Sequence, residues 1–190
     1  MTPLVSMVIA AYERPIEIAV TIHCLLAQTL QDFEIIVVHD GPGERVRDVV
    51  RSICDHRIVY CETPVRFNDW GNSSKEYGTH MASGQYIGHT NDDNYYAPLY
   101  LAAMVHALQS TDSQFALCNM VHSHHGYNVL NTRPEPGWID GGGWLCDASV
   151  VKQTPWPEPK SFQGADGLYA HSLASQCQVV KTQGILFVHN

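Results

Sequence analysis

Short apolar runs rich in β-branched residues alternate with helical patterns along the first part of the chain. The runs at residues 4–10 and 33–39 are too short for helices and read as buried strands. Between them, Pro15 and apolar residues at helical spacing predict a helix over 15–27. A strand, a helix and a second strand in succession form a βαβ unit, whose strands are parallel. The sequence therefore predicts an α/β fold of doubly wound type, with a mainly parallel sheet flanked by helices.

The alternation continues beyond this first unit. Further helices are expected over 44–53, from Ser73 or Ser74 to 81, and over 98–108, and further strands over 57–61, 85–89 and 115–121. After Val121, Gly and Pro become frequent and predict ribbons and loops, followed by a helix over 166–175 and a final strand over 185–189. No linker or repeat interrupts the pattern, so a single domain over residues 1–190 is expected.

Composition narrows the classes of partner. The 190 residues are 45% hydrophobic and 16% charged, which excludes an intrinsically disordered chain. The formal net charge is -8 and no Lys/Arg cluster is visible, so nucleic acid is not expected as a partner. A polyanionic substrate would need a metal ion to offset this charge.

The cysteines and the apolar runs indicate a compartment. Six cysteines are scattered singly, without a C-x-x-C pair, and read as free thiols. The first residues lack the pattern of a signal peptide, and no apolar run approaches the roughly 18 to 20 residues of a bilayer span. We therefore expect no membrane span and a cytoplasmic location.

Polar side chains follow the predicted parallel strands, where ligands of open α/β sheets bind. They are Ala11-Tyr12-Glu13, Asp40 and the segment 91–94 (Asn-Asp-Asp-Asn). The adjacent carboxylates of Asp92 and Asp93 repel each other unless a cation or hydrogen-bond donors compensate them, which favours a divalent ion. The alternative is a solvated turn that caps the helix near Pro98.

The order and the amino-acid sequences of these segments resemble those of a known protein family. The stretches VSMVIAAYERP, AQTLQDFEIIVVHDG and GQYIGHTNDDN are similar to the nucleotide-sugar-dependent glycosyltransferases of the GT-A fold, in particular the inverting family 2. The resemblance covers residues 3 to 110 well. Beyond Val121 it rests on spaced landmarks, which are Trp138-Ile-Asp-Gly-Gly-Gly-Trp-Leu-Cys-Asp, Gly164-Ala-Asp-Gly and His189.

The resemblance implies a role for each matching position. The nucleoside pocket would be lined by Ala10, Ala11, Tyr12 and Glu13. Tyr12 would stack on the base, Asp40 would accept hydrogen bonds from the base or ribose, and Asp92 would face the ribose or sugar. Asp93 and His189 would bind the metal, and Asp166 would be the general base.

The same resemblance implies the reaction and its partners. A sugar would move with inversion, as in a hexosyltransferase, from a nucleotide-diphospho-sugar, with UDP favoured, to a hydroxyl of a carbohydrate or other acceptor. The cofactor would be Mn²⁺ or Mg²⁺. Residues 1–121 would form the nucleotide-sugar-binding half, and residues 122–190 would supply acceptor-side loops, the catalytic-base helix and the terminal strand. A homodimer is one way to complete the acceptor site.

Several alternatives stay open on the sequence alone. A nucleotidyltransferase would share the layout, but the loop Ala11-Tyr12-Glu13-Arg14 lacks the usual glycine-rich basic signature. A nucleotide-sugar-binding scaffold without turnover is the other alternative, because Ala165-Asp166 stands where the family usually has Glu-Asp.

Individual residues have alternatives too. Tyr12 could be a turn residue, Asp166 a helix N-cap and His189 part of a frayed end. The histidines His122, His124 and His125 could bind zinc, although an adventitious or acceptor-side role is favoured. Lys75 reads as a solvated surface charge, and Trp138, Trp144 and Trp156 either contact sugar rings or fill a small apolar core.

Overall fold

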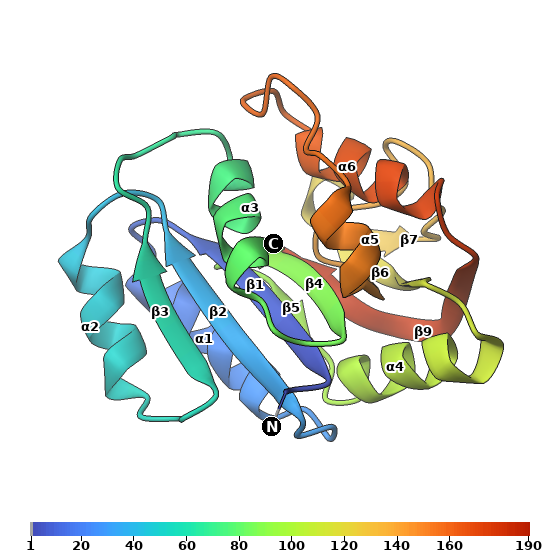
Figure 1. Cartoon of the computed structure of the whole chain (residues 1–190), viewed down its shortest axis with the longest axis horizontal. Helices are drawn as coiled ribbons and strands as arrows, with labels where there is room; N and C mark the ends of the chain where they lie inside the picture. Colours follow the sequence, from blue (N-terminus) through green and yellow to red (C-terminus); the bar gives the residue numbers. More distant parts are fainter. Residues whose placement is uncertain (1) are drawn as a thin grey trace.

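One mixed sheet forms the centre of the molecule. The computed structural model describes residues 2–190, and its sheet has nine strands in the order β3-β2-β1-β4-β8-β6-β9-β5, with β7 paired to β6 (Figure 1). The strands are β1 (Val5–Ala11), β2 (Phe33–His39), β3 (Ile58–Glu62), β4 (Tyr86–Asn91), β5 (Tyr95–Tyr96), β6 (Phe115–His122), β7 (Asn128–Leu130), β8 (Trp144–Asp147) and β9 (Val179–His189).

The first four strands of this order are parallel. Ile9 in β1 lies between Val37 of β2 and Thr90 of β4, and β3 continues the parallel pairing beyond β2. The carboxyl ends of these strands therefore meet at one edge of the sheet, the upper edge in Figure 1, toward which β2 and β3 point. Residues 10–14, Asp40 and 91–94 follow these ends, as the sequence predicts.

The second half of the sheet brings the end of the chain back to this edge. β8 is antiparallel to both β4 and β6, and β9 runs parallel to β6 and antiparallel to β5. His122 and His189 are register partners at the carboxyl ends of β6 and β9. This pairing joins residues from both predicted halves of the chain in a continuous sheet.

Helices cover both faces of the sheet and bury two separate cores. The helices are α1 (Pro15–Leu26), α2 (Glu44–Ser52), α3 (Asn72–Met81), α4 (Tyr100–Thr111), α5 (Ala148–Gln153) and α6 (Ala165–Ala174), with a 3₁₀ turn at Ser123–His125. One core contains Ile9 of β1 with apolar residues of α1, α2 and α4. The other contains Val8 of β1 with residues of α5 and α6. Successive strand residues thus face opposite layers, as expected for a sheet covered on both sides.

The structure differs from the sequence-based expectation mainly after Val121. The final strand was expected over 185–189 but begins at Val179. Its first half was not predicted because it carries polar residues such as Lys181 and Gln183 and ends at Gly184, whose φ is +91°. β7 and β8 lie in the region where ribbons and loops were expected, whereas the helix α5 was not expected there. Asp147 caps the N-terminus of α5, and its carboxylate accepts the Ser149 amide hydrogen bond at 2.8 Å.

Among residues 2–190, we find no helix with the length and apolar character that crossing a bilayer requires.

Candidate active site

Two adjoining cavities open at the carboxyl edge of the sheet. The first has a volume of about 550 Å³ and is lined by residues that follow β1, β2 and β4, together with the loop before α3. The second, of about 490 Å³, is lined by the ends of β6 and β9, the loop before β8 and the start of α6. Trp70 and Asn91 line both cavities. Two bound groups would therefore meet at these two side chains.

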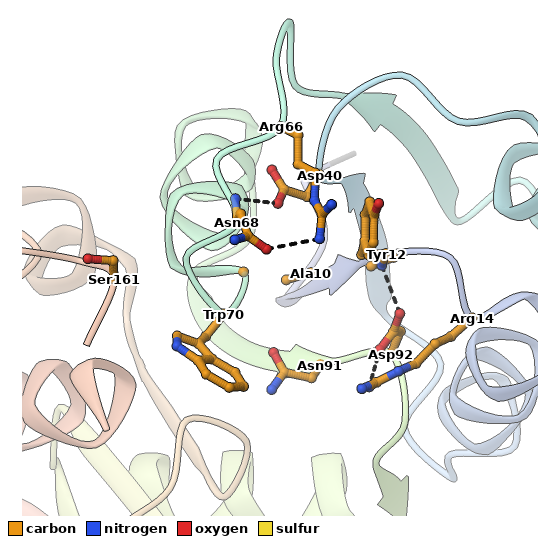
Figure 2. A pocket seen from close by; sticks show the side chains of 12 residues that line it. Ala10, Tyr12, Arg14, Asp40, Arg66, Asn68, Trp70, Asn91, Asp92 and Ser161 are labelled. Carbon is orange, nitrogen blue, oxygen red and sulfur yellow. Dashed lines mark hydrogen bonds and ion pairs between the residues drawn. The ribbon is translucent and has the colours of Figure 1, made fainter. Parts of the chain in front are cut away.

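The first cavity gathers most of the residues predicted to bind a nucleotide. Its lining includes Ala10, Ala11, Tyr12, Asp40 and Asp92 (Figure 2). Figure 2 shows Trp70 and Ser161 across the cavity from Tyr12. The sixth residue predicted for this pocket, Glu13, has φ = 52° and turns its carboxylate toward His39, at 3.9 Å from the ring Nε2. Glu13 therefore supports the turn beside the cavity.

Tyr12 forms an aromatic wall that is partly covered by a cation. The Arg66 guanidinium lies over the Tyr12 ring, 3.9 Å from its centroid. The Tyr12 amide donates a hydrogen bond to Asp92 Oδ2 at 2.9 Å, which fixes the backbone from which the ring projects. A planar ring held in this way is a suitable surface for stacking.

Asp40 organises the loop on the far side of the cavity. Its Oδ1 accepts the Phe67 amide at 2.8 Å and its Oδ2 accepts the Asn68 amide at 2.9 Å. Asn68 and Trp70 both have positive φ, so this segment is held in a conformation that non-glycine residues seldom adopt. The buried carboxylate thereby positions Trp70 between the two cavities.

The two adjacent carboxylates are compensated by an arginine. Arg14 Nη1 lies 3.1 Å from Asp92 Oδ1 and 2.5 Å from Asp93 Oδ2. Burial raises the pKa of Asp92 to about 6, with a further contribution from Asp93, while the Tyr12 amide and Arg14 oppose the rise. The cation and the hydrogen-bond donor that compensate these carboxylates are thus supplied by the loop between β1 and α1.

The second cavity contains the predicted general base. Asp166 lies in the first turn of α6, and its Oδ1 accepts the amide hydrogen bond of Gly167 at 2.8 Å. Its Oδ2 lies 3.9 Å from the ammonium of Lys75, whose side chain is only 1% exposed. The expectation of a solvated Lys75 is therefore wrong, because α3 places this residue on its sheet-facing side beside Gly78 and Thr79.

A cluster of two histidines and one carboxylate lines the same cavity. His122 and His189 stack with parallel rings, 4.1 Å between centroids, and both turn Nε2 toward Asp140 Oδ2, at 3.8 and 3.6 Å. Burial and the neighbouring histidines lower the pKa of His122 to about 4. Burial and the charge of Asp166 raise the pKa of Asp140.

The predicted metal ligands Asp93 and His189 have different contacts. Asp93 binds Arg14, whereas His189 joins His122 and Asp140. One ligand atom from each member of that group lies within 4.8 Å of the others. His122 and His124 do not share one face of a strand, because His124 belongs to the 3₁₀ turn after β6, and the register partner of His122 is His189.

Asn91 lies in the segment 91–94 that the sequence places at a ligand edge, but the sequence assigned no individual role to Asn91, Trp70 or Asp140. Asn91 is the last residue of β4, and a role in ligand binding could have been inferred from this position at the carboxyl end of the strand. Trp70 lies in an irregular loop, and Asp140 reaches the site only through the placement of the loop before β8. No local pattern indicates Trp70, and Asp140 is marked only by its place in the landmark that begins at Trp138.

The tryptophans that were singled out mostly belong to the core. Trp144 is fully buried, and Trp156 stacks on Tyr169 at 4.0 Å between ring centroids. His89 is buried against both rings, and burial lowers its pKa to about 3. Trp138 is partly exposed, and the Arg133 guanidinium lies over one part of its ring. Apolar filling is thus the role of Trp144 and Trp156.

Comparison with known proteins places these features in a family. The profile of the family described as glycosyl transferase family 2 matches residues 6–153. The chain is 26% identical over 156 residues to UDP-Glc:alpha-D-GlcNAc-diphosphoundecaprenol beta-1,3-glucosyltransferase WfaP of Escherichia coli, covering 80% of this chain and 59% of that protein. It is 31% identical over 139 residues to validoxylamine A glucosyltransferase of Streptomyces hygroscopicus subsp. jinggangensis, covering 70% of this chain and 31% of that protein.

Solved structures confirm the predicted fold. The S. aureus TarS fragment 1-349 in complex with UDP superposes with a TM-score of 0.81 at 13% identity, over 97% of this chain and 59% of that one. The mannosyltransferase PcManGT from Pyrobaculum calidifontis, in complex with GDP-Man and Mn²⁺, gives 0.80 at 16% identity, over 100% and 57%. The expected GT-A fold is confirmed. The chain spans less than two thirds of the length of each of these four relatives.

Proposed function

The chain belongs to glycosyl transferase family 2, and from that premise we propose that it transfers a sugar from a nucleotide-diphospho-sugar to an acceptor hydroxyl. The observation that carries this proposal is the junction of the two cavities at Trp70 and Asn91. On one side lie the residues assigned to the nucleotide, and on the other lies Asp166. A donor in the first cavity would direct its sugar toward a hydroxyl in the second.

The nucleotide would be held by the first cavity, with UDP favoured. Two relatives support this preference. The name of WfaP specifies UDP-Glc as its donor, and a TarS fragment was solved in complex with UDP-GlcNAc. In this proposal the base stacks with Tyr12 and Arg66, and Asp40 accepts a hydrogen bond from the base or ribose through lone pairs not used by the two loop amides. Ala10 and Ala11 leave room for the nucleoside, and Asp92 faces the ribose or sugar.

Asp166 would accept the proton of the attacking hydroxyl. The acceptor oxygen then bonds to the anomeric carbon as the bond to the diphosphate breaks, and the proton passes to Asp166 Oδ2. One displacement of this kind inverts the anomeric centre. The Lys75 ammonium, 3.9 Å from Oδ2, would hold the orientation of this carboxylate.

A divalent cation, Mn²⁺ or Mg²⁺, is the proposed cofactor. When bound, it would supply positive charge to the leaving diphosphate. The predicted ligands fit it in part: His189 lies beside two further donor groups, whereas Asp93 is already neutralised by Arg14. Arg14 is therefore itself a candidate to contact the diphosphate.

We propose in addition how the acceptor site is completed and where the protein is located. The loops after β6, or a second copy of the chain in a homodimer, would complete an acceptor site around the second cavity. The free cysteines support a cytoplasmic location.

The test is donor turnover by the Asp166→Asn variant. The wild-type chain should release nucleoside diphosphate from at least one member of a nucleotide-sugar panel with Mn²⁺ and acceptors, and NMR of the product should show an inverted anomeric centre. Loss of the base should lower turnover by about 100- to 10,000-fold. Donor affinity, measured by calorimetry, should stay unchanged because Asp166 lies outside the first cavity.

Asp112→Asn is the matched control. This exposed residue ends α4 with φ = 53°, a conformation that Asn also tolerates, so its turnover should equal that of the wild type. Tight nucleotide binding without turnover of any donor would indicate the scaffold alternative. Pyrophosphate release from a nucleoside triphosphate and a sugar phosphate would indicate a nucleotidyltransferase.

A further inference from the structure

Trp70 is the most exposed tryptophan of the chain, and it lines both cavities. Trp70 is 67% exposed, whereas Trp144 and Trp156 are buried and pack against other rings. The ring of Trp138 has the Arg133 guanidinium over it. Within residues 2–190, the Trp70 ring has no stacking or cation–π partner of this kind. The indole therefore contributes little to the folded core, and its position at the junction of the cavities has another cause.

The backbone on both sides of Trp70 holds it in a strained conformation. Trp70 has φ = 62°, a region that bulky residues rarely adopt. The buried carboxylate of Asp69 fixes the chain after it by accepting the Ser73 amide at 3.0 Å. Gly71 packs so closely on the first strand that a Cβ there would lie 2.6 Å from Ala10 Cβ. Single exposed apolar residues are common, but strain that is held in place by its surroundings is typical of ligand sites.

The composition of the second cavity indicates which ligand would use this ring. Among residues 2–190 that line it, Trp70 is the only Phe, Tyr or Trp. Most of the remaining lining can form hydrogen bonds, through histidines, an amide at Gln163 and the carboxylates of Asp140 and Asp166. A pyranose ring has the matching surface, with C–H groups on its face and hydroxyls around its edge. One aromatic face among polar groups therefore suits a sugar better than it suits a lipid or an apolar side chain.

We propose that the acceptor is a carbohydrate, and that Trp70 binds it by stacking on the C–H face of the pyranose ring that carries the attacking hydroxyl. This inference rests on the proposed transferase function, in which Asp166 accepts the proton of that hydroxyl. Asp166 lines only the second cavity, so the acceptor ring has to approach the junction from that side. The nucleotide has an aromatic wall of its own in Tyr12. Trp70 would thus select the acceptor without taking part in bond formation.

The experiment measures sugar binding without turnover. The chain is labelled with fluorotryptophan and titrated, in the presence of UDP, with the methyl glycosides of glucose, mannose, galactose and N-acetylglucosamine. The fluorine resonance of Trp70, assigned by its absence in Trp70→Phe, should shift with at least one glycoside, while those of the buried Trp144 and Trp156 stay in place. N-acetylserine amide, which offers a hydroxyl without a sugar ring, should cause no shift. A shift of Trp70 with this compound alone would overturn the carbohydrate assignment.

Variants then test whether the ring itself supplies the affinity. Trp70→Ala should weaken binding of the responding glycoside by about tenfold or more, as measured by ligand-observed NMR, and Trp70→Phe should lose much less because it keeps an aromatic face. The affinity for UDP, measured by calorimetry, should stay unchanged in both variants. The fluorine shift of the wild type keeps the proposal testable if Trp70→Ala does not fold.

The matched control is Phe67→Ala. Phe67 is an exposed aromatic residue of the same loop and lines neither cavity, and its amide bond to Asp40 does not depend on its side chain. Glycoside binding should equal that of the wild type. Equal affinity in Trp70→Ala and the wild type would overturn the proposal, and so would a loss confined to UDP or shared by Phe67→Ala. Failure of the proposed function is a separate result, namely no nucleoside diphosphate released by the wild type from any donor, and it leaves these binding measurements intact.

Discussion

Arg14 holds one guanidinium nitrogen between two neighbouring carboxylates at the edge of the first cavity. The Asp92 side chain is almost completely buried, whereas half of the Arg14 side chain is exposed. The exposed cation only partly offsets the burial of its partner, and so burial raises the pKa of Asp92 to about 6 from an ordinary value of 3.8. The folded chain therefore binds this proton more tightly than the unfolded chain does.

This difference in proton affinity between the folded and unfolded chains predicts that Asp92 makes the free energy of unfolding depend on pH. The contribution of Asp92 is fully present below pH 3.8 and is lost as the pH rises through about 6. At about 1.4 kcal/mol per pKa unit, the free energy of unfolding of the wild type should fall by about 3 kcal/mol relative to Asp92→Asn across that window. Urea unfolding of both chains between pH 3.5 and 7, values that bracket the two pKa values, measures this difference. A difference that stays flat over this range would contradict the assignment.

Single residues were predictable where a local pattern fixes their position. Tyr12, Asp40 and Asp92 follow strands that their own apolar runs identify, and all three line the first cavity. His122 and His189 meet only because β6 pairs with β9, and Asp140 reaches them through the loop before β8. That contact depends on long-range pairing, which no window of the sequence contains. The roles assigned to the residues, including Asp166 and His189, stay predictions.

At the scale of elements, α3 links the packing of the sheet to the site. This helix carries Lys75 and begins at Asn72, two residues after Trp70, and it contacts β1 and β2 through Gly78. A Cβ at Gly78 would lie 2.4 Å from Val8 Cγ1 and 2.9 Å from Val38 Cγ2. The glycine therefore permits the close approach that brings Lys75 to Asp166.

Gly78→Ala should consequently destabilise the chain although alanine favours helices. The overlap with two buried valines should cost about 1–3 kcal/mol, more than the roughly 1 kcal/mol that alanine contributes in a helix interior. Denaturant unfolding measures the change. His80→Ala, an exposed position on the same helix, is the control and should stay within about 0.5 kcal/mol of wild type. A more stable Gly78→Ala chain would show that α3 can move away from the sheet without cost.

Elements were predictable in proportion to their burial. β1 and β2 are buried on both faces and appear in the sequence as nearly continuous apolar runs. β9 begins with an exposed, polar segment that pairs with only part of β6, and β8 has four residues between two long strands. Such strands gain their stability from neighbours that are distant in sequence, so periodicity does not identify them.

The whole molecule combines a net charge of -8 with a local concentration of cations. Arg14 and Arg66 line the first cavity, and the buried Lys75 lies beside Asp166, a residue that lines the second. The overall charge repels an anionic ligand, whereas these three groups attract one at the edge where the cavities meet. Recognition of a nucleoside diphosphate would therefore depend on its phosphates as well as on its base.

A thermal-shift comparison of UDP, GDP, dTDP and CDP, with and without Mn²⁺, tests whether the chain recognises both the base and the phosphates of a nucleotide. A ligand present at 100 times its dissociation constant adds about 2.7 kcal/mol to the stability of the folded chain, which should raise Tm by roughly 5–10 °C. UDP should give the largest shift, and uridine, which lacks the phosphates, a much smaller one. Added salt should reduce the UDP shift because the Arg14 side chain is half exposed and its charge is screened. Tyr12→Ala should lose the shift for every nucleotide, and equal shifts for uridine and UDP would mean that the cations at this edge do not recognise the diphosphate.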